Sequence, residues 1–214
     1  MSNRPPPHFQ KTLPTEKKIS LAEAERAIYI DFEGFEKEAP ALLGVLIDES
    51  FGQIILDEKF QGAATYKSPM RFVPGKQLIS ELLDRSIKEG RRIVAFSAHE
   101  KEQCMRWYQI DISKQYVNAR IVARMLSKGT EREEKPRTLK EYEQLTGFAR
   151  KKDTGERLNT KCLREALKDL EQYGELRNKG RRTGWTKLRE HNRQDVEAMK
   201  HIVMATFSQS ISTN

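Results

Sequence analysis

The sequence contains little cysteine and no long apolar run. Its 214 residues include only two cysteines, Cys104 and Cys162, which lie far apart and lack the close spacing of cysteines that bind a metal. We expect both thiols to remain reduced, as they do in a cytoplasmic protein, and to act as small or inert side chains. No apolar stretch approaches the roughly 20 residues needed to cross a bilayer, so no membrane partner is expected. The N-terminal Met-Ser-Asn-Arg-Pro-Pro-Pro-His also lacks the apolar centre of a signal peptide.

Charge, in contrast, is abundant, and the positive excess is concentrated in one segment. Charged residues make up 33% of the chain, and the formal net charge is +8. Residues 120–193 hold 21 Lys and Arg against 12 Asp and Glu, whereas the rest of the chain holds 18 against 19. A local basic surface is typical of proteins that bind a polyphosphate such as nucleic acid. The alternative is a solvated helical surface rich in Lys and Arg, and charge alone does not separate the two.

Apolar periodicity divides the chain into an arm and one domain. Residues 1–26 contain Pro5-Pro6-Pro7 and scattered lysines, which predicts a mobile or loosely docked arm with at most a short helical turn near residues 21–26. Residues 27–210 form the predicted domain. Its strand signals lie at residues 27–32, 41–47, 53–56, 93–96 and 116–122. Its helix signals lie at residues 75–90, 99–108, 138–146, 159–172 and 184–207, with Gly-containing basic loops at 147–157 and 176–184.

The predicted elements follow the order β-β-β-α-β-α-β-α. Turn residues at 48–52 predict that the early strands form an antiparallel meander. The later strands are joined through helices, which predicts a mixed sheet. We therefore expect an α/β protein with a mixed five-stranded sheet flanked by helices. This is the element order of the ribonuclease-H-like fold.

The run Ile28-Tyr29-Ile30-Asp31-Phe32-Glu33-Gly34 carries two carboxylates at the end of an apolar strand. Residues i and i+2 share a face of a strand, so Asp31 and Glu33 should project together while Phe32 points into a core. Gly34 lets the backbone turn. Two carboxylates on one face repel each other unless a cation lies between them. The alternative is a strand that simply ends in a polar turn.

Two further acidic positions follow later in the chain. Glu100 comes just after the strand at 93–96 and at the start of a helix that Ser97 could cap, where a Glu can also serve only to complement the helix dipole. His191 and Asp195 are four residues apart and lie on one face of the last helix. Such a pair can be a plain surface pair, but an apolar stripe on this helix predicts that it packs on the sheet.

Three motifs in this order resemble the DEDD exonuclease superfamily, namely Tyr29-Ile-Asp31-Phe-Glu33-Gly, Phe96-Ser-Ala-His-Glu100-Lys and His191-Asn-Arg-Gln-Asp195-Val-Glu-Ala. The chain is most similar to predicted ribonuclease-H-like nucleases that occur alone or fused to RecB-type nuclease or helicase modules. Arg137-Thr-Leu-Lys-Glu-Tyr-Glu-Gln-Leu-Thr-Gly-Phe and Trp185-Thr-Lys-Leu-Arg-Glu also resemble that group. The resemblance covers about residues 27–207. It implies a ribonuclease-H-like fold and hydrolysis of nucleic acid from the 3′ end.

By this resemblance, the expected ligands of two Mg²⁺ or Mn²⁺ ions are Asp31, Glu33, Glu100 and Asp195, because hard cations prefer oxygen ligands. Two such ions about 3.5–4 Å apart can activate a water, hold the scissile phosphate and stabilise the leaving 3′ oxygen. His191 would orient or deprotonate that water, as histidine commonly does near neutral pH. Two positions depart from the family pattern. Glu100 stands where proofreading exonucleases usually have Asp, and His191 has the spacing to Asp195 that is usual for tyrosine-type members.

The expected phosphate contacts are basic residues of the two loops, namely Lys151, Lys152, Lys179, Arg181 and Arg182. Trp185 beside them could stack on a nucleobase, and a core or loop-anchoring role is the alternative. The sequence therefore favours a two-metal 3′–5′ exonuclease that acts on DNA or RNA. A second hypothesis is a nucleic-acid-binding module that keeps the fold but has lost turnover through changes at Glu100 and His191. A third is a structural or adaptor protein whose charge serves solubility.

Overall fold

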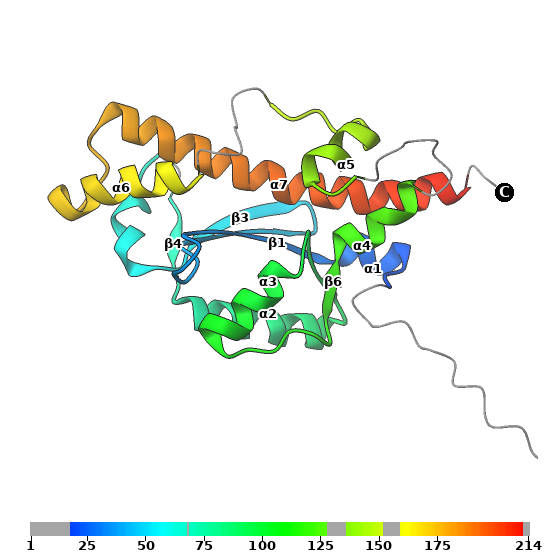
Figure 1. Ribbon diagram of the computed structural model, residues 1–214. Helices are drawn as coiled ribbons and strands as arrows, with labels where there is room; N and C mark the ends of the chain where they lie inside the picture. The colour runs from blue at the N-terminus through cyan, green and yellow to red at the C-terminus, as the bar shows by residue number, and fades with distance from the viewer. Residues whose placement is uncertain (1–17, 68, 128–135, 152–158, 212–214) are drawn as a thin grey trace, which may run out of the picture.

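A mixed six-stranded sheet forms the centre of the molecule, with helices on both faces (Figure 1). The structure, a computed structural model, describes residues 18–67, 69–127, 136–151 and 159–211. The strands are β1 (Ile28–Glu33), β2 (Leu42–Ile47), β3 (Ser50–Ile55), β4 (Arg71–Phe72), β5 (Ile93–Ala95) and β6 (Tyr116–Asn118). Their order across the sheet is β4-β3-β2-β1-β5-β6. Neighbours among β1, β2 and β3 are antiparallel, whereas β4, β5 and β6 pair in parallel with β3, β1 and β5, respectively.

One long helix, α7 (Lys179–Ile211), crosses one face of the sheet, and α2 (Gly75–Glu89) and α3 (His99–Gln103) cover the other (Figure 1). The other α-helices are α1 (Leu21–Arg26), α4 (Ala119–Ala123), α5 (Leu139–Thr146) and α6 (Asn159–Tyr173). Shorter turns are the 3-10 helices η2 (Glu58–Ala63) and η4 (Arg124–Ser127) and the π-helical segment η3 (Cys104–Tyr108). Although α7 has 33 residues, it is not apolar enough to cross a membrane, and neither is any other helix of the described residues.

Alternation along β1 decides which of its side chains meet α7. Ile30 and Phe32 pack in the apolar cluster between the sheet and α2. Tyr29 points to the opposite face and packs in the cluster that includes the buried stripe of α7. Because side chains alternate along a strand, Asp31 and Glu33 continue the row of Tyr29 and also face α7. The strand therefore supplies a core on one face and two carboxylates on the other.

The α/β class and a mixed sheet flanked by helices are confirmed, but the predicted sheet is incomplete. The sixth strand, β4, was not predicted, because its two residues are too few to show an alternating pattern. The strand predicted at 116–122 ends at Asn118, whose side chain accepts a hydrogen bond from Ile121 N at 3.2 Å and caps α4. Residues 119–122 are therefore helical.

The predictions at the two ends of the chain also change. The last helix begins at Lys179 and not at residue 184, so most of the expected loop at 176–184 belongs to α7. The predicted helical turn at residues 21–26 is present as α1, which starts with a capping box of Ser20 and Glu23. Ala24 of α1 is fully buried, and its carbonyl accepts a hydrogen bond from Tyr29 Oη at 2.8 Å, so α1 belongs to the folded core. Residues 1–17 of the predicted arm lie outside the described residues.

Candidate metal centre

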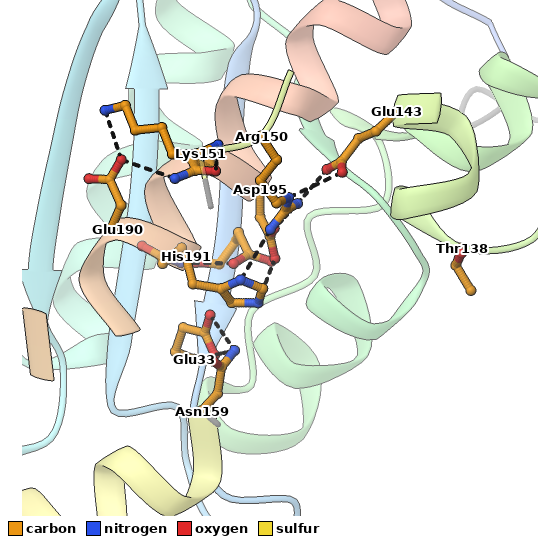
Figure 2. Close-up of polar contacts among 12 residues, drawn as sticks. Glu33, Thr138, Glu143, Arg150, Lys151, Asn159, Glu190, His191 and Asp195 are labelled. Carbon is orange, nitrogen blue, oxygen red and sulfur yellow. Dashed lines mark hydrogen bonds and ion pairs between the residues drawn. The ribbon is translucent and has the colours of Figure 1, made fainter. Parts of the chain in front are cut away.

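The end of β1 presents two carboxylates to α7, as the strand period predicts. Glu33 is only 6% exposed. Asn159, the first residue of α6, donates Nδ2–H bonds to both carboxylate oxygens of Glu33, at 3.0 and 2.8 Å (Figure 2). A carboxylate held at both oxygens by one amide has a fixed plane, so Glu33 is oriented before any ligand binds.

Asp31 is held by a side chain of α7. Asn192, fully buried, donates from Nδ2 to the Asp31 carbonyl at 3.0 Å and to Asp31 Oδ2 at 2.8 Å. Its Oδ1 accepts a hydrogen bond from Gln53 Nε2 at 2.9 Å. Gly44 lies between Asp31 and Gln53 in the strand register, and a Cβ there would lie 2.3 Å from Asn192 Oδ1. The glycine therefore leaves the space in which Asn192 fixes Asp31.

His191 and Asp195 stand on one face of α7, as their spacing predicts. His191 is 6% exposed, and its Nε2 lies 3.4 Å from Asp195 Oδ2. Ligand atoms of Glu33, His191 and Asp195 all lie within 4.8 Å of one another. Among the described residues, these three therefore form the tightest group that could hold a metal ion.

Glu100 reaches the same region from the start of α3. It is 6% exposed, and Ser97 Oγ lies 3.4 Å from its Oε2. Ser97 also accepts a hydrogen bond from His99 N at 3.2 Å, so the turn between β5 and α3 is closed by its hydroxyl. The carboxylate of Glu100 acts electrostatically on Asp31. Glu100 and Asp31 nevertheless lie outside the tight group of three potential ligands.

Burial and mutual repulsion raise the pKa values of these carboxyl groups. Burial, followed by the nearby carboxylates of Asp195, Glu33 and Glu100, raises the pKa of Asp31 well above its ordinary value, and the hydrogen bond from Asn192 opposes this rise. Burial and the Asp195 carboxylate raise the pKa of Glu33 to about 8. Burial raises the pKa of Glu100 to about 7. Asp31, Glu33 and Asp195 therefore share a buried site in which burial and like charge oppose ionisation, and the charge of Glu100 acts on Asp31 from α3.

A guanidinium that the sequence analysis did not single out stands beside this site. Arg150 follows α5 and donates from Nη2 to Asp195 Oδ1 at 2.5 Å, and its Nη1 lies 3.1 Å from His191 Nδ1 (Figure 2). The same side chain is anchored to Glu143 of α5, with Nε 3.1 Å from Glu143 Oε2 and Nη2 bonded to Oε1. Glu143 is 3% exposed. Burial opposes the charge of Arg150, but its bonds to Glu143 and Asp195 raise its pKa above the ordinary value.

Two of the five predicted phosphate contacts, Arg181 and Arg182, are engaged elsewhere. Arg181 pairs with the buried Asp169 at 2.5 Å, and Arg182 donates to the Leu176 carbonyl at 2.7 Å. At about 1.5 Å per residue, Arg181 and Arg182 lie roughly 14–21 Å along α7 from His191 and Asp195. Three other predicted contacts remain to be placed. Lys151 is largely exposed and pairs with Glu190 at 3.0 Å, Lys179 is exposed at the start of α7, and Lys152 lies outside the described residues.

The stacking role predicted for Trp185 is wrong, and the alternative, a core role, is confirmed. Its indole is fully buried and stacks on Phe60 of η2, with ring centroids 5.8 Å apart and an interplanar angle of 11°. Leu163 and Leu170 of α6 belong to the same apolar cluster. A ring enclosed in this way has no face for a nucleobase, so Trp185 joins α6, α7 and η2 as a core residue.

A large cavity lies on the other side of α7. It has a volume of about 1080 Å³ and is lined by β3, the loop before β4, α2 and α7. Its α7 residues include Arg189 and Arg193, which at about 100° per residue are roughly 160–200° around the helix from His191. The cavity is thus separated by α7 from the carboxylates, and size alone does not locate the chemistry.

Three side chains that position the site residues were not predicted from the sequence. Asn192 lies inside a quoted motif, and Gly44, in the apolar run of β2, is the signal that could have pointed to it, since glycine in a strand often marks a close approach. Asn159 was predicted only as the start of a helix. Arg150 was predicted only as part of a basic loop, and no local pattern connects it with Asp195.

The chain was compared with models of protein families, with curated proteins and with solved structures, and none of the three comparisons finds a match. Any function of the chain therefore has to be inferred from the geometry and chemistry of the site.

Proposed function

We propose that this protein is a metal-dependent nuclease of the DEDD type, with a ribonuclease-H-like fold, that hydrolyses DNA or RNA from the 3′ end. One observation carries the proposal. Carboxylates from β1, α3 and α7 gather at one end of β1, where burial, followed by the charges of Asp195, Glu33 and Glu100, raises the pKa of Asp31. Such a cluster is electrostatically unfavourable, so its presence indicates a functional role. Its oxygen ligands are suited to binding divalent cations.

The residues present suit Mg²⁺ or Mn²⁺. The donors are carboxylate oxygens with one imidazole, and cysteine is absent from the group around Glu33, His191 and Asp195. Glu33 and Asp195 would hold a first ion, and Asp31 and Glu100 would complete the site. Two bound ions would activate a water, neutralise the phosphate and stabilise the leaving 3′ oxygen.

The surrounding side chains prepare this site in ways that do not require a ligand. Asn159 and Asn192 belong to helices that are distant from β1 in sequence, and they donate hydrogen bonds to Glu33 and Asp31. The carboxylates are therefore oriented before a ligand binds. His191 stands beside Asp195 and would accept a proton from the attacking water at a ring nitrogen. Preorganised charge of this kind is the main source of rate enhancement in phosphoryl transfer.

The region next to Glu33 has room for a strand of nucleic acid. A cavity of about 470 Å³ is lined by the segment after β1 and by α6, with Phe35, Lys37 and Arg164 among its residues. Glu36 and Glu38 also line it and balance the two cations, so the ring of Phe35 is the feature that suits a nucleobase. This cavity is a better candidate for the end of the substrate than the predicted contacts near Arg181.

The sheet order supports the ribonuclease-H-like part of the proposal. Three antiparallel strands are followed by parallel β5 and β6, with the carboxylates of β1 at the centre and the last helix crossing them. β4 extends this sheet as a two-residue edge strand. We also propose a cytoplasmic location, which the free and buried Cys104 and Cys162 support.

Cleavage of end-labelled single-stranded DNA and RNA tests the function. The substrates are incubated with Mg²⁺, Mn²⁺ or EDTA and with wild type, Asp31→Asn or Asp195→Asn. We expect metal-dependent laddering from the 3′ end that both variants abolish. A blocked 3′ end tests polarity, and a circular substrate reveals endonuclease activity. Salt-sensitive binding by wild type without any cleavage would refute the enzyme.

That last outcome defines the second candidate, a nucleic-acid-binding module without turnover. One observation favours it: Arg150 is bound to both Asp195 and His191 and so occupies two groups that the reaction needs. The cleavage assay separates the two functions, because a permanent Arg150 contact predicts no cleavage at any metal concentration.

A further inference from the structure

We propose that Arg150 is the internal cation of the metal-free site, and that a divalent cation binds by displacing its guanidinium from Asp195 and His191. The inference deepens the proposed function and rests on its metal site. Arg150 reaches the site from the segment after α5, while the groups that it contacts belong to α7. The contact therefore joins two separate elements and can open without unfolding either.

The hydrogen-bond pattern shows why the two cations exclude each other. Arginine only donates, so Nδ1 of His191, 3.1 Å from Arg150 Nη1, must be the acceptor and carry no proton. In neutral imidazole the proton then lies on Nε2, which is 3.4 Å from Asp195 Oδ2. Both ring nitrogens are thus committed. Neither can bind a metal ion or take a proton from water until Arg150 leaves.

Asp195 is committed in the same way. Its Oδ1 accepts from Arg150 Nη2 at 2.5 Å, and its Oδ2 lies against His191. A metal ion at Asp195 would bring a second positive charge next to the guanidinium in a site that is largely shielded from water. Like charges at this distance repel strongly where the dielectric is low, so the metal ion and the guanidinium should not bind Asp195 at the same time.

A resting place for the displaced side chain already exists. Glu143 holds Arg150 through both Nε and Nη2, independently of Asp195. When Asp195 is taken by a metal ion, the bidentate contact with Glu143 remains and the charge of Arg150 stays paired. Glu143 is therefore the anchor, and the bonds to Asp195 and His191 are the exchangeable half.

The affinity for Mn²⁺ tests the inference without any substrate. Free Mn²⁺ is measured by electron paramagnetic resonance in titrations of the metal-free protein. Removing Arg150 alone would leave Glu143 buried and unpaired, so the informative variant is the double Arg150→Met/Glu143→Gln, compared with Glu143→Gln and with wild type. Loss of a charge-assisted contact that opposes binding should strengthen Mn²⁺ affinity by about tenfold to a hundredfold over Glu143→Gln. Arg150→Lys keeps the positive charge but lacks the planar guanidinium, so its Mn²⁺ affinity should lie between those of wild type and the double variant.

Lys151→Met is the matched control, because it removes the neighbouring, largely exposed positive charge, which pairs with Glu190. It should change Mn²⁺ affinity by less than about twofold, since an exposed charge is screened. A second readout is the ¹⁵N spectrum of the histidine rings. In wild type, Mg²⁺ should shift both ring nitrogens of His191, whereas in the double variant Nδ1 should already lack the Arg150 bond before Mg²⁺ is added.

The outcomes separate this inference from the proposed function. Tighter Mn²⁺ binding by the double variant supports it. If wild type binds Mn²⁺ and the double variant binds equally or more weakly, Arg150 does not compete with the metal, and the inference is overturned while the metal site stands. If no folded variant, wild type included, binds Mn²⁺, both the inference and the proposed metal site are wrong.

Discussion

Replacing Glu100 by glutamine is expected to stabilise the metal-free protein at alkaline pH. Burial raises the pKa of Glu100 from its ordinary 4.5 to about 7, so the folded protein disfavours the ionised carboxylate. Below pH 4.5 the carboxyl is protonated in the folded and unfolded states alike and has no effect. Between pH 4.5 and about 7 only the unfolded chain releases the proton, so wild-type stability falls as the pH rises. Glutamine cannot ionise and removes this fall.

The size of the effect follows from the two pKa values. At about 1.36 kcal/mol per pH unit, a rise from 4.5 to about 7 amounts to about 3 kcal/mol above pH 7. Each kcal/mol changes the melting temperature of a protein of this size by roughly 2–4 °C, so Glu100→Gln should melt about 6–12 °C above wild type near pH 8. The glutamine carbonyl can still accept the hydrogen bond from Ser97 Oγ, which lies 3.4 Å from Glu100 Oε2.

Thermal and urea unfolding in EDTA, from about pH 4.5 to about pH 8, measures this difference. Glu25→Gln, at an exposed position of α1, is the control and should stay within about 0.5 kcal/mol of wild type. Adding Mg²⁺ should stabilise wild type more than Glu100→Gln, because binding to the folded state adds stability. If Glu100→Gln is no more stable than wild type near pH 8 in EDTA, the electrostatic description of the cluster is refuted.

Three further changes test the packing beside the site and along α6 and α7. Gly44→Ala should cost about 1–3 kcal/mol in urea unfolding, because its Cβ would lie 2.3 Å from Asn192 Oδ1, and strictly additive costs with Asn192→Ala would contradict that contact. Burial opposes ionisation of Asp169, but backbone N–H bonds and Arg181 lower its pKa. Asp169→Asn should therefore lose about 1–3 kcal/mol near neutral pH, and the loss should vanish as the pH falls through the lowered pKa; a pH-independent loss would argue against the ion pair. Trp185→Ala should cost about 3–5 kcal/mol, whereas Trp185→Phe should leave the affinity for single-stranded DNA unchanged, and a large drop in affinity would restore the stacking role.

The sequence predicted those parts of the site that depend on local periodicity. A period of two placed Asp31 and Glu33 on one face, and a spacing of four placed His191 and Asp195 on another. The structure brings these groups and Glu100 together. Local patterns succeed here because the backbone geometry of one strand or one helix determines which side chains are neighbours.

Contacts between distant segments could not be predicted in this way. Arg150 meets Asp195 across 45 residues of sequence, and Asn192 meets Asp31 across 161. Trp185 was judged by its basic neighbours, although the position of α6 decides its burial. Arg181 looked available to phosphate because its partner Asp169 lies on another helix. In each case the deciding contact is tertiary, and no spacing rule within one element reports it.

The single amide of Asn192 links the chemistry of the site to the docking of α7. The same helix that carries His191 and Asp195 is fastened to β1 and β3 through that amide, which bonds to Asp31 and Gln53 together. A cation held between β1 and α7 would therefore strengthen the same contact that holds the helix on the sheet. Cation binding and helix docking are thermodynamically linked, so metal should slow the exchange of the α7 amide protons with solvent, and the logarithm of the slowing should increase with the free energy of metal binding.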